Sequence, residues 1–406
     1  MAAADAASAW AALDAAWLSA RLGRAVARFS LDAADTGKLN ALSCLRFARA
    51  ELSDGTQLAL AVKLAAASPT SRRLGLAREA LLLRHWRELS TAEGSSCELG
   101  SVLPPVLYAE GSLETGAKVI VLEDLSASCV QLGRLFGKGN PNNWGVDLEA
   151  STRRVPPALD AAAATRLAFS AAAKLHAPYW GCRALVGQPS LSWLRGAGWL
   201  GGRESEAWVA TQAEVAAHWA AVKAKIAGAQ EQGYRVRWDP LVVAILDASV
   251  AKAAQGGWAA LQAELAARDF TLCHGDFHPA NVLLDCASQK VFLVDWEVVG
   301  LGSGVQELGQ FAISHLDPLT RATVERDAVT AYYAELINLN PRVAATMSEQ
   351  QCWHEYKMGG LGRWCFFLPF DGWGQPPAVS QFFVDQVAAF VKQHGLTPET
   401  APMPRL

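Results

Sequence analysis

Alternating apolar and polar positions near the start of the chain predict a small antiparallel sheet. The predicted strands are Ala25–Leu31, Ala41–Leu52, Leu58–Leu64, Val102–Ala109 and Ala117–Leu122. A strong turn signal, Ser53-Asp54-Gly55, joins the second and third strands. Between the third and fourth strands, apolar residues recur at helical spacing and predict a helix over Ser71–Leu89.

The pattern becomes helical in the rest of the chain. The predicted helices are Leu159–His176, Glu204–Ala229, Pro240–Gln255, Trp258–Ala267, Val305–Ser314, Leu319–Asn338, Ser348–Lys357 and Gln381–His394. Three short strand-like runs, Phe270–Cys273, Val282–Asp285 and Val291–Val294, interrupt them. The segment between the two regions, Val130–Pro157, is rich in Gly, Asn, Pro and Arg and is expected to form loops. We therefore expect an α+β protein with a strand-rich N-lobe over residues 1–125 and a larger helical C-lobe over residues 126–406.

The alanine-rich N-terminus also has helical spacing. The apolar positions that repeat there are Trp10, Leu13, Trp17 and Leu18. Gly23 follows as a helix C-cap, which favours an amphipathic helix packed on the body of the protein. An organellar transit peptide is the alternative, but Asp5 and Asp14 are acidic and no arginine precedes Arg21.

Composition narrows the class of protein. Of 406 residues, 51% are hydrophobic and 18% are charged, which is enough to bury a large core. The net charge of −3 argues against nucleic acid as a partner. No stretch of 18 apolar residues is free of charges and helix breakers, so no membrane span is expected. Eight scattered cysteines without a C-x-x-C pair predict reduced thiols and a cytoplasmic protein.

Most of the candidate chemistry lies in one segment of the C-lobe. Asp276 and Asn281 are five residues apart, which is the spacing between the catalytic-loop aspartate and the Mg²⁺-binding asparagine of protein kinases. Asp295 follows 14 residues later, at the end of an apolar strand. A carboxylate that holds the attacking hydroxyl, together with oxygen ligands for Mg²⁺, is what phosphoryl transfer requires. A zinc site built from Cys273, His274 and His278 is disfavoured, because no second pair of ligands is evident.

His274-Gly275-Asp276-Phe277-His278-Pro279-Ala280-Asn281 resembles the H-G-D-x-H-x-x-N motif of the aminoglycoside phosphotransferase and choline kinase superfamily. The branch that it resembles most is the ecdysteroid-kinase-like small-molecule kinases. The resemblance implies a two-lobed protein-kinase-like fold that uses ATP and Mg²⁺. It also implies that Asp276 is the catalytic residue and that Asn281 and Asp295 bind the metal.

The N-lobe offers a matching lysine and glutamate. Lys63 ends the apolar strand Ala61-Val62-Lys63-Leu64, and Glu79 lies 16 residues further on in the predicted helix. This arrangement fits a lysine that holds the α- and β-phosphates of ATP and is itself held by a glutamate. The alternatives are a solvated lysine at a strand end and a surface glutamate, and the downstream motif favours the ion pair.

The rest of the nucleotide site is implied by the resemblance. The segment that contains Glu123, Asp124 and Leu125 resembles the hinge between the lobes, where the backbone would bind adenine. Asn40 and Ser43 lie in a loop between two strands, where backbone and side chains could cap the phosphates, and an ordinary hairpin turn is the equal alternative.

Several positions depart from related patterns. Gly275 replaces the arginine of the H-R-D motif and Glu297 replaces the glycine of the D-F-G motif, which favours a constitutively assembled small-molecule kinase. Glu307 stands where the superfamily usually has aspartate, so its carboxylate is one methylene further out.

The sequence gives little information about the identity of the acceptor molecule. An aromatic cluster near the C-terminus could line its pocket: Trp353, Tyr356, Trp364, Phe366, Phe367, Phe370 and Trp373. Most of these side chains are expected in the core, and the others would fit a sterol-like alcohol or an amino alcohol, with an aminoglycoside-like acceptor less favoured. We therefore expect an ATP- and Mg²⁺-dependent phosphotransferase acting on a small-molecule hydroxyl. The alternatives are a kinase-like binding protein without turnover and a nucleotidyl transferase.

Overall fold

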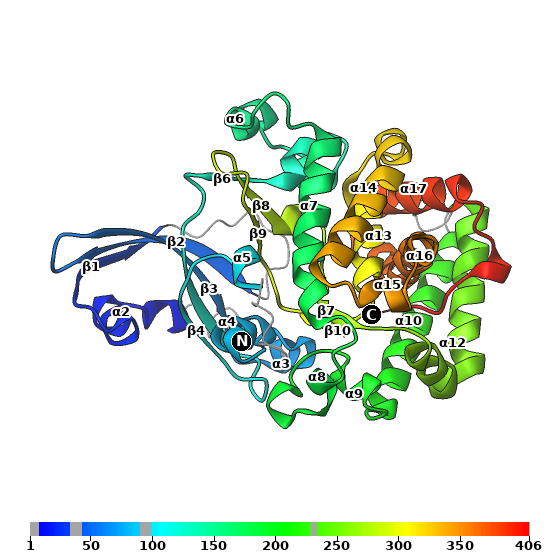
Figure 1. The fold of residues 1–406 in the computed structure, drawn as a ribbon, viewed down its shortest axis with the longest axis horizontal. Coiled ribbons are helices and arrows are strands. Elements are labelled where there is room, and N and C mark those ends of the chain that lie inside the picture. The colour runs from blue at the N-terminus through cyan, green and yellow to red at the C-terminus, as the bar shows by residue number, and fades with distance from the viewer. Residues whose placement is uncertain (1–7, 33–42, 90–98, 229–233, 406) are drawn as a thin grey trace.

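The computed structural model describes residues 8–32, 43–89, 99–228 and 234–405. Its strand-rich N-terminal lobe and larger, mainly helical C-terminal lobe confirm the predicted α+β class (Figure 1). The N-lobe sheet has five antiparallel strands in the order β1-β2-β3-β5-β4. Their bounds are β1 Val26–Leu31, β2 Cys44–Leu52, β3 Gln57–Ala65, β4 Val106–Gly111 and β5 Lys118–Glu123.

Short helices cover the N-lobe sheet. Helix α2, Ala15–Leu22, ends at Gly23 as predicted, but it begins only at an Asp14 N-cap, so Trp10 and Leu13 lie before it and not in one continuous helix. It contributes Leu18 to a buried cluster with Leu60 and Val62 on β3, so the predicted packing of this segment on the body is confirmed. Two helices, α3 Pro69–Leu74 and α4 Arg78–His85, follow β3.

Two N-lobe predictions are wrong at their boundaries. The single helix expected over Ser71–Leu89 is interrupted at Gly75, whose φ of +68° caps α3 in a left-handed conformation that glycine adopts without strain. The strand expected from Val102 begins only at Val106, because Leu99–Val102 forms the short helix α5.

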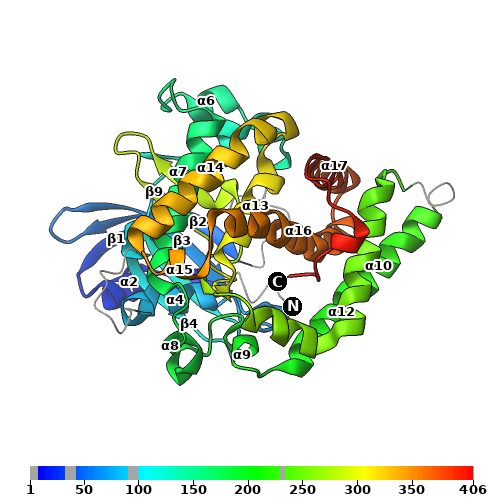
Figure 2. The same cartoon turned by 45° about the vertical axis from the view of Figure 1, so that its right-hand side comes forward.

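The C-lobe is built from helices around a few short strands. The long helices are α7 Ala161–His176, α10 Ser205–Ala227, α12 Pro240–Ala266, α13 Gly304–His315, α14 Pro318–Leu339, α16 Glu349–Gly374 and α17 Pro377–Gln393. In Figure 2, α10 and α12 lie side by side at one end of the lobe, and α16 runs from α13 towards them. Helix α12 is broken by a non-helical Gly257, which lies between the two helices that the sequence predicted there.

Short elements complete the C-lobe and fill the predicted loop region. These are β6 Cys129–Gln131, α6 Leu148–Thr152, α8 Ala184–Gly187, α9 Ala197–Leu200, β7 Thr271–Cys273, β8 Val282–Asp285, β9 Val291–Leu293, β10 Gly300–Gly302 and α15 Val343–Thr346. Strand β6 pairs with β8, and β7 pairs with β10. None of the helices in the described ranges is both long and apolar enough to cross a membrane.

Helix α16 extends 17 residues beyond the predicted Ser348–Lys357, to Gly374. Its glycines let it pass close to α13. A Cβ atom on Gly309 of α13 would lie 2.6 Å from the Cα atom of Gly360 and 2.4 Å from the carbonyl oxygen of Tyr356. Such approaches are closer than van der Waals contact, so neither glycine at the crossing can gain a side chain without moving the two helices apart.

We therefore expect Gly309→Ala to lower the melting temperature by several degrees, because the added methyl group overpacks the crossing of α13 and α16. Gly374→Ala is the matched control, since no atom lies within 4 Å of a Cβ placed there. The melting temperatures of both variants are measured by thermal unfolding monitored with circular dichroism. Equal melting temperatures for the two variants would contradict the close crossing.

Candidate active site

Asp276 lies in the loop between β7 and β8, where three polar side chains surround its carboxylate. The Nδ2 group of Asn281 donates to the Asp276 carbonyl at 3.0 Å and to its Oδ2 atom at 3.3 Å. The Nε2 group of Gln310 donates to Oδ1 at 3.1 Å. His278 Nε2 lies 3.4 Å from Oδ2. These contacts fix the orientation of the carboxylate.

The charge of Asp276 is stabilised by its neighbours. Burial alone would raise the pKa of the carboxyl group, but the positive charges of His278, His274 and Arg363 outweigh it, and the pKa lies below its ordinary value. Burial opposes the charge on His278, yet Asp276 raises the pKa of that imidazole. At neutral pH, Asp276 is therefore an ionised hydrogen-bond acceptor.

Glu307 holds the backbone of this loop from below. Its carboxylate accepts hydrogen bonds from the backbone N–H groups of His274 at 3.0 Å and Gly275 at 2.5 Å. His176 Nε2 lies 3.1 Å from the same carboxylate. The longer side chain of Glu307 thus performs the bracing that the superfamily's aspartate would provide.

Gly275 can occupy its position only as glycine. Its φ is +86°, and a Cβ atom there would lie 2.1 Å from the carbonyl oxygen of Val298. The absence of an arginine at this position therefore has a steric cause. A different arginine, Arg363 of α16, donates to the carbonyl of Gly275 and to Gln310 at 3.0 Å.

A cluster of five charged side chains joins the two lobes, and four of them are buried or nearly so while Asp295 is partly exposed. Lys63 Nζ lies 2.8 Å from Glu79, 2.6 Å from Asp295 and 3.1 Å from Glu297. The expected ion pair of Lys63 and Glu79 is therefore present. A second lysine, Lys118, contacts Glu79 and lies 2.6 Å from Glu297.

The charges in this cluster support one another. Burial opposes the charge of Lys63, but three carboxylates raise the pKa of its ammonium group well above the ordinary value. Burial also opposes the charge of Glu79, yet Lys118 and Lys63 lower its pKa to about 2. For Asp295, burial together with the charges of Glu79 and Glu297 raises the pKa against the pull of Lys63.

Sequence reasoning missed Lys118, Gln310 and Arg363, and the cluster role of Glu297. In the folded sheet Lys118 stands opposite Ala65 while Lys63 stands opposite Ile120, so both lysines lie on one face, a register that the sequence alone did not show. Gln310 lies one helical turn after Glu307 on the fully buried α13. No local pattern indicated Arg363.

Two features suit a divalent cation. Asn281 turns its Nδ2 group towards Asp276, so the amide oxygen receives no hydrogen bond from the described residues. Oxygen atoms of Glu79, Asp295 and Glu297 lie within 4.8 Å of one another. Asp295 adopts φ of +69°, a strained conformation for a residue other than glycine. These donor atoms are the hard oxygen ligands that Mg²⁺ takes.

The other predicted nucleotide-site residues are only partly described. Glu123 ends β5, and Asp124 donates its backbone N–H to Ala59 at 2.9 Å, at the passage between the lobes. Ser43 directly precedes β2. Asn40 lies outside the described residues.

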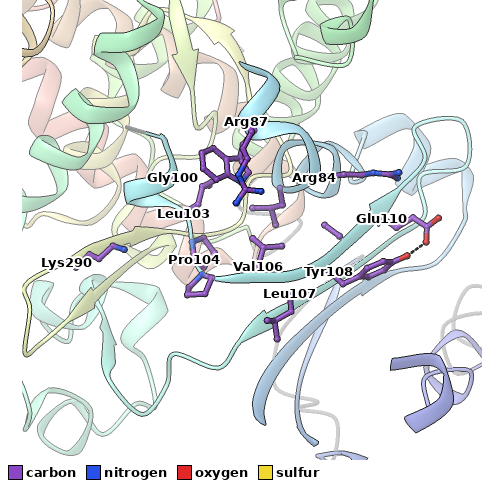
Figure 3. Close-up of a pocket in the computed structure, with 14 residues that line it drawn as sticks. Arg84, Arg87, Gly100, Leu103, Pro104, Val106, Leu107, Tyr108, Glu110 and Lys290 are labelled. Atoms are coloured by element: carbon purple, nitrogen blue, oxygen red, sulfur yellow. Dashed lines mark hydrogen bonds between the residues drawn. The ribbon is translucent and has the colours of Figure 1, made fainter. Parts of the chain in front are cut away.

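A cavity also lies elsewhere, on the N-lobe (Figure 3). It measures about 590 Å³ and is lined mainly by β4, including Tyr108, and by the residues just before β4. Arg84 of α4, Arg87 of the turn after α4 and Lys290 of the turn after β8 complete its lining. None of its lining residues belongs to the loop of Asp276 or to the charged cluster. Size alone therefore does not identify the active site.

Residues 149–342 match the model of the phosphotransferase enzyme family. This match supports a small-molecule phosphotransferase and confirms the resemblance at the level of the superfamily. No comparison shows particular closeness to the ecdysteroid-kinase-like branch. Asp276, Asn281, Asp295 and Glu307 lie inside the matched region, whereas Lys63 lies outside it. No curated protein matches the chain.

Several solved structures are similar over most of the chain. A choline/ethanolamine kinase family protein from Mesorhizobium loti is 16% identical, with a TM-score of 0.42, over 91% of this chain and 90% of that one. A macrolide 2'-phosphotransferase from Brachybacterium faecium is 16% identical, with a TM-score of 0.41, over 88% and 97%. A choline kinase from Streptococcus pneumoniae is 11% identical, with a TM-score of 0.43, over 90% and 94%.

We expect Glu307→Gln to lower the melting temperature and to speed hydrogen exchange at the amides of His274 and Gly275. A carboxamide offers one oxygen acceptor where the carboxylate offers two, so one buried N–H loses its partner. Glu206→Gln, an exposed position on α10, is the control.

The stability difference should also depend on pH. Burial opposes the charge of Glu307, but His176 outweighs it and lowers the pKa below the ordinary 4.5. The stabilisation by the ionised group is therefore full at neutral pH and declines as pH falls below 4.5. A difference between wild type and Glu307→Gln that grows as the pH falls would contradict this role.

Proposed function

We propose that this protein, whose residues 149–342 match the phosphotransferase enzyme family, transfers the γ-phosphoryl group of ATP to a hydroxyl group of a small molecule. The observation that carries the proposal is the ionised Asp276 carboxylate. Asn281 and Gln310 orient it, and His274 of the same loop lies 2.9 Å from the carbonyl oxygen of Val294, the residue before Asp295.

Asp276 is the proposed catalytic residue. One of its carboxylate oxygens accepts a hydrogen bond from the acceptor hydroxyl and takes its proton as the phosphoryl group is transferred. Gln310 and Asn281 hold the carboxylate, so that little reorganisation is needed during the reaction. Glu307 and Arg363 act as positioning residues through the backbone of Gly275.

Lys63 is the proposed ligand of the α- and β-phosphates. Its present contact with Asp295 must be exchanged for phosphate oxygens, whereas Glu79 can continue to hold it. Lys118 supports this arrangement, because it neutralises Glu79 and Glu297 when Lys63 turns towards the nucleotide.

Asn281 and Asp295 are the proposed ligands of Mg²⁺. When bound, the metal would neutralise charge on the phosphate oxygens. The backbone of Glu123, Asp124 and Leu125 would bind adenine, and Asn40 and Ser43 would cap the phosphates. These three assignments follow the resemblance described above.

The acceptor proposed from the sequence is a sterol-like alcohol, an amino alcohol or an aminoglycoside-like molecule. Four of the aromatic residues considered for its pocket, Trp353, Tyr356, Trp364 and Phe367, pack in or against the main core. Phe370 is half-buried, and its ring lies 4.4 Å from that of His218 on α10. These four side chains therefore serve the core and are not available to line an acceptor pocket.

ATP is expected to raise the melting temperature, and more so with Mg²⁺, because a ligand that binds only the folded state stabilises it by mass action. Asp295→Ala should remove the Mg²⁺-dependent part of the shift. Asp327→Ala, an exposed carboxylate on α14, is the control and should keep it. The absence of a shift with both ATP and GTP on folded protein would favour a protein of this fold without nucleotide chemistry.

Asp276→Asn is expected to reduce turnover by at least about a hundredfold while it largely preserves the ATP-induced shift, because the amide cannot take the proton. Products from a panel of alcohols are to be analysed by ³¹P NMR. ADP and a phosphorylated alcohol support the kinase, pyrophosphate indicates nucleotidyl transfer, and no product indicates a binding protein. Near-normal turnover by Asp276→Asn would disprove the role of Asp276.

A further inference from the structure

A second cavity, of about 100 Å³, lies beside the loop of Asp276. Gly275 and Val298 form its wall on the loop side. Trp199 and Trp208 contribute apolar surface, and Met403 of the C-terminal segment closes another side. The cavity is distinct from the charged cluster, since neither lysine of that cluster lines it.

Four arginines line this cavity, and two of them are neutralised. Arg268 lies 3.2 Å from Glu264 and 2.7 Å from Glu355. Arg405 lies 2.5 Å from each of the same two glutamates. This pair of arginines and pair of glutamates form a balanced network, so they contribute little net charge to the cavity.

The other two arginines form no direct ion pair with a carboxylate of the described residues, although the charges of Glu307 and Asp276 act on Arg363. Arg363 donates only to Gln310 and to the carbonyl of Gly275. Arg195 has no side-chain hydrogen bond and no ion pair within the described ranges, although it is largely enclosed. Asp269 also lines the cavity and adds a negative charge. Four arginines therefore stand against the three carboxylates of Glu264, Glu355 and Asp269, which leaves an excess of positive charge.

The backbone of Arg195 is held firmly in this position. Its N–H donates to Val299 at 3.2 Å, and its carbonyl accepts from Leu301 at 2.7 Å. A Cβ atom on Gly300 would lie 2.4 Å from that carbonyl oxygen, so the two segments are in close contact. Burial, together with the charges of Arg363 and Arg78, holds the pKa of Arg195 well below its ordinary value against the opposing charge of Asp276. An enclosed cation without a partner is costly, and such groups are characteristic of binding sites.

We propose that Arg195 and Arg363 bind an anionic group of the acceptor, a carboxylate or a phosphate, in this cavity. The inference rests on the proposed function and names its substrate class, an amphipathic hydroxy-anion. A planar guanidinium pairs with such groups through two hydrogen bonds, and the apolar walls accept the body of the molecule. Because Gly275 precedes Asp276, an anion held here places the rest of the acceptor next to the catalytic carboxylate. A cationic amino alcohol would be repelled by the same two arginines.

Phenyl phosphate is a suitable probe, because it has an anionic head and an apolar body but no hydroxyl acceptor. Isothermal titration should show saturable binding to the wild type and no binding of neutral benzyl alcohol or cationic benzylamine. Arg195→Gln should weaken the binding of phenyl phosphate at least about tenfold. Arg183→Gln, an exposed arginine over the ring of Phe270, is the control and should leave binding unchanged.

Stability separates a binding role from a structural one. Removal of an enclosed, unpaired charge should raise the melting temperature of the unliganded protein in Arg195→Gln, whereas the loss of a structural contact would lower it. Arg195→Lys keeps the charge and should retain part of the affinity. This variant tests the proposal even if Arg195→Gln does not fold.

The outcomes distinguish this inference from the proposed function. Unchanged affinity in Arg195→Gln and Arg195→Lys, or binding of benzylamine in place of phenyl phosphate, would overturn the inference. If Lys63→Met abolishes the binding of phenyl phosphate and Arg195→Gln does not, the probe binds in the nucleotide site. This result would also overturn the inference. A third outcome is that phenyl phosphate binding depends on Arg195 while ATP does not change the melting temperature. This outcome would support the anion site in the cavity and contradict only the proposed kinase activity.

Discussion

The contact of two lysines with three carboxylates is the interaction on which the candidate site depends. Lys63 and Lys118 come from the N-lobe sheet and Glu79 from α4, whereas Asp295 and Glu297 come from the C-lobe. Each group would be costly to bury alone, so the cluster holds the lobes in register only while every charge has a partner. Three carboxylates against two ammonium groups leave one negative charge, which suits an added cation.

The same reasoning explains the departures from the expected motif. Glu307 is one methylene longer than the usual aspartate, yet both of its oxygens reach the backbone of the catalytic loop. Gly309 follows in the same helix and allows α16 to pass at van der Waals distance. Helix α16 in turn supplies Arg363, which binds the loop from the other side. The loop is thus braced by charged side chains from two helices that glycines bring together.

Local sequence patterns predicted the elements whose causes are local. The turn at Gly55, the C-cap at Gly23 and the strand of Lys63 follow from residue preferences and hydrophobic alternation. The break at Gly75 was missed because periodic apolar positions continue on both sides of it. The extent of α16 was missed because its glycines and Pro369 are weak helix formers that tertiary packing tolerates.

The residues of the candidate site likewise fall into those that a local sequence pattern predicted and those that it missed. The loop of Asp276 and Asn281 is contiguous in sequence, so its motif was visible. Gln310, Arg363 and Lys118 reach the site from other elements, and each is a common residue without a local signature. Their roles follow from burial and partners, which only the folded structure provides.

The most direct test of the account is a crystal structure with Mg²⁺ and a non-hydrolysable ATP analogue. The account predicts Mg²⁺ bound to Asp295 and Asn281, and Lys63 moved from Asp295 to the phosphates while it keeps its contact with Glu79. A nucleotide bound away from this cluster, or a Lys63–Asp295 pair that persists with nucleotide present, would contradict it.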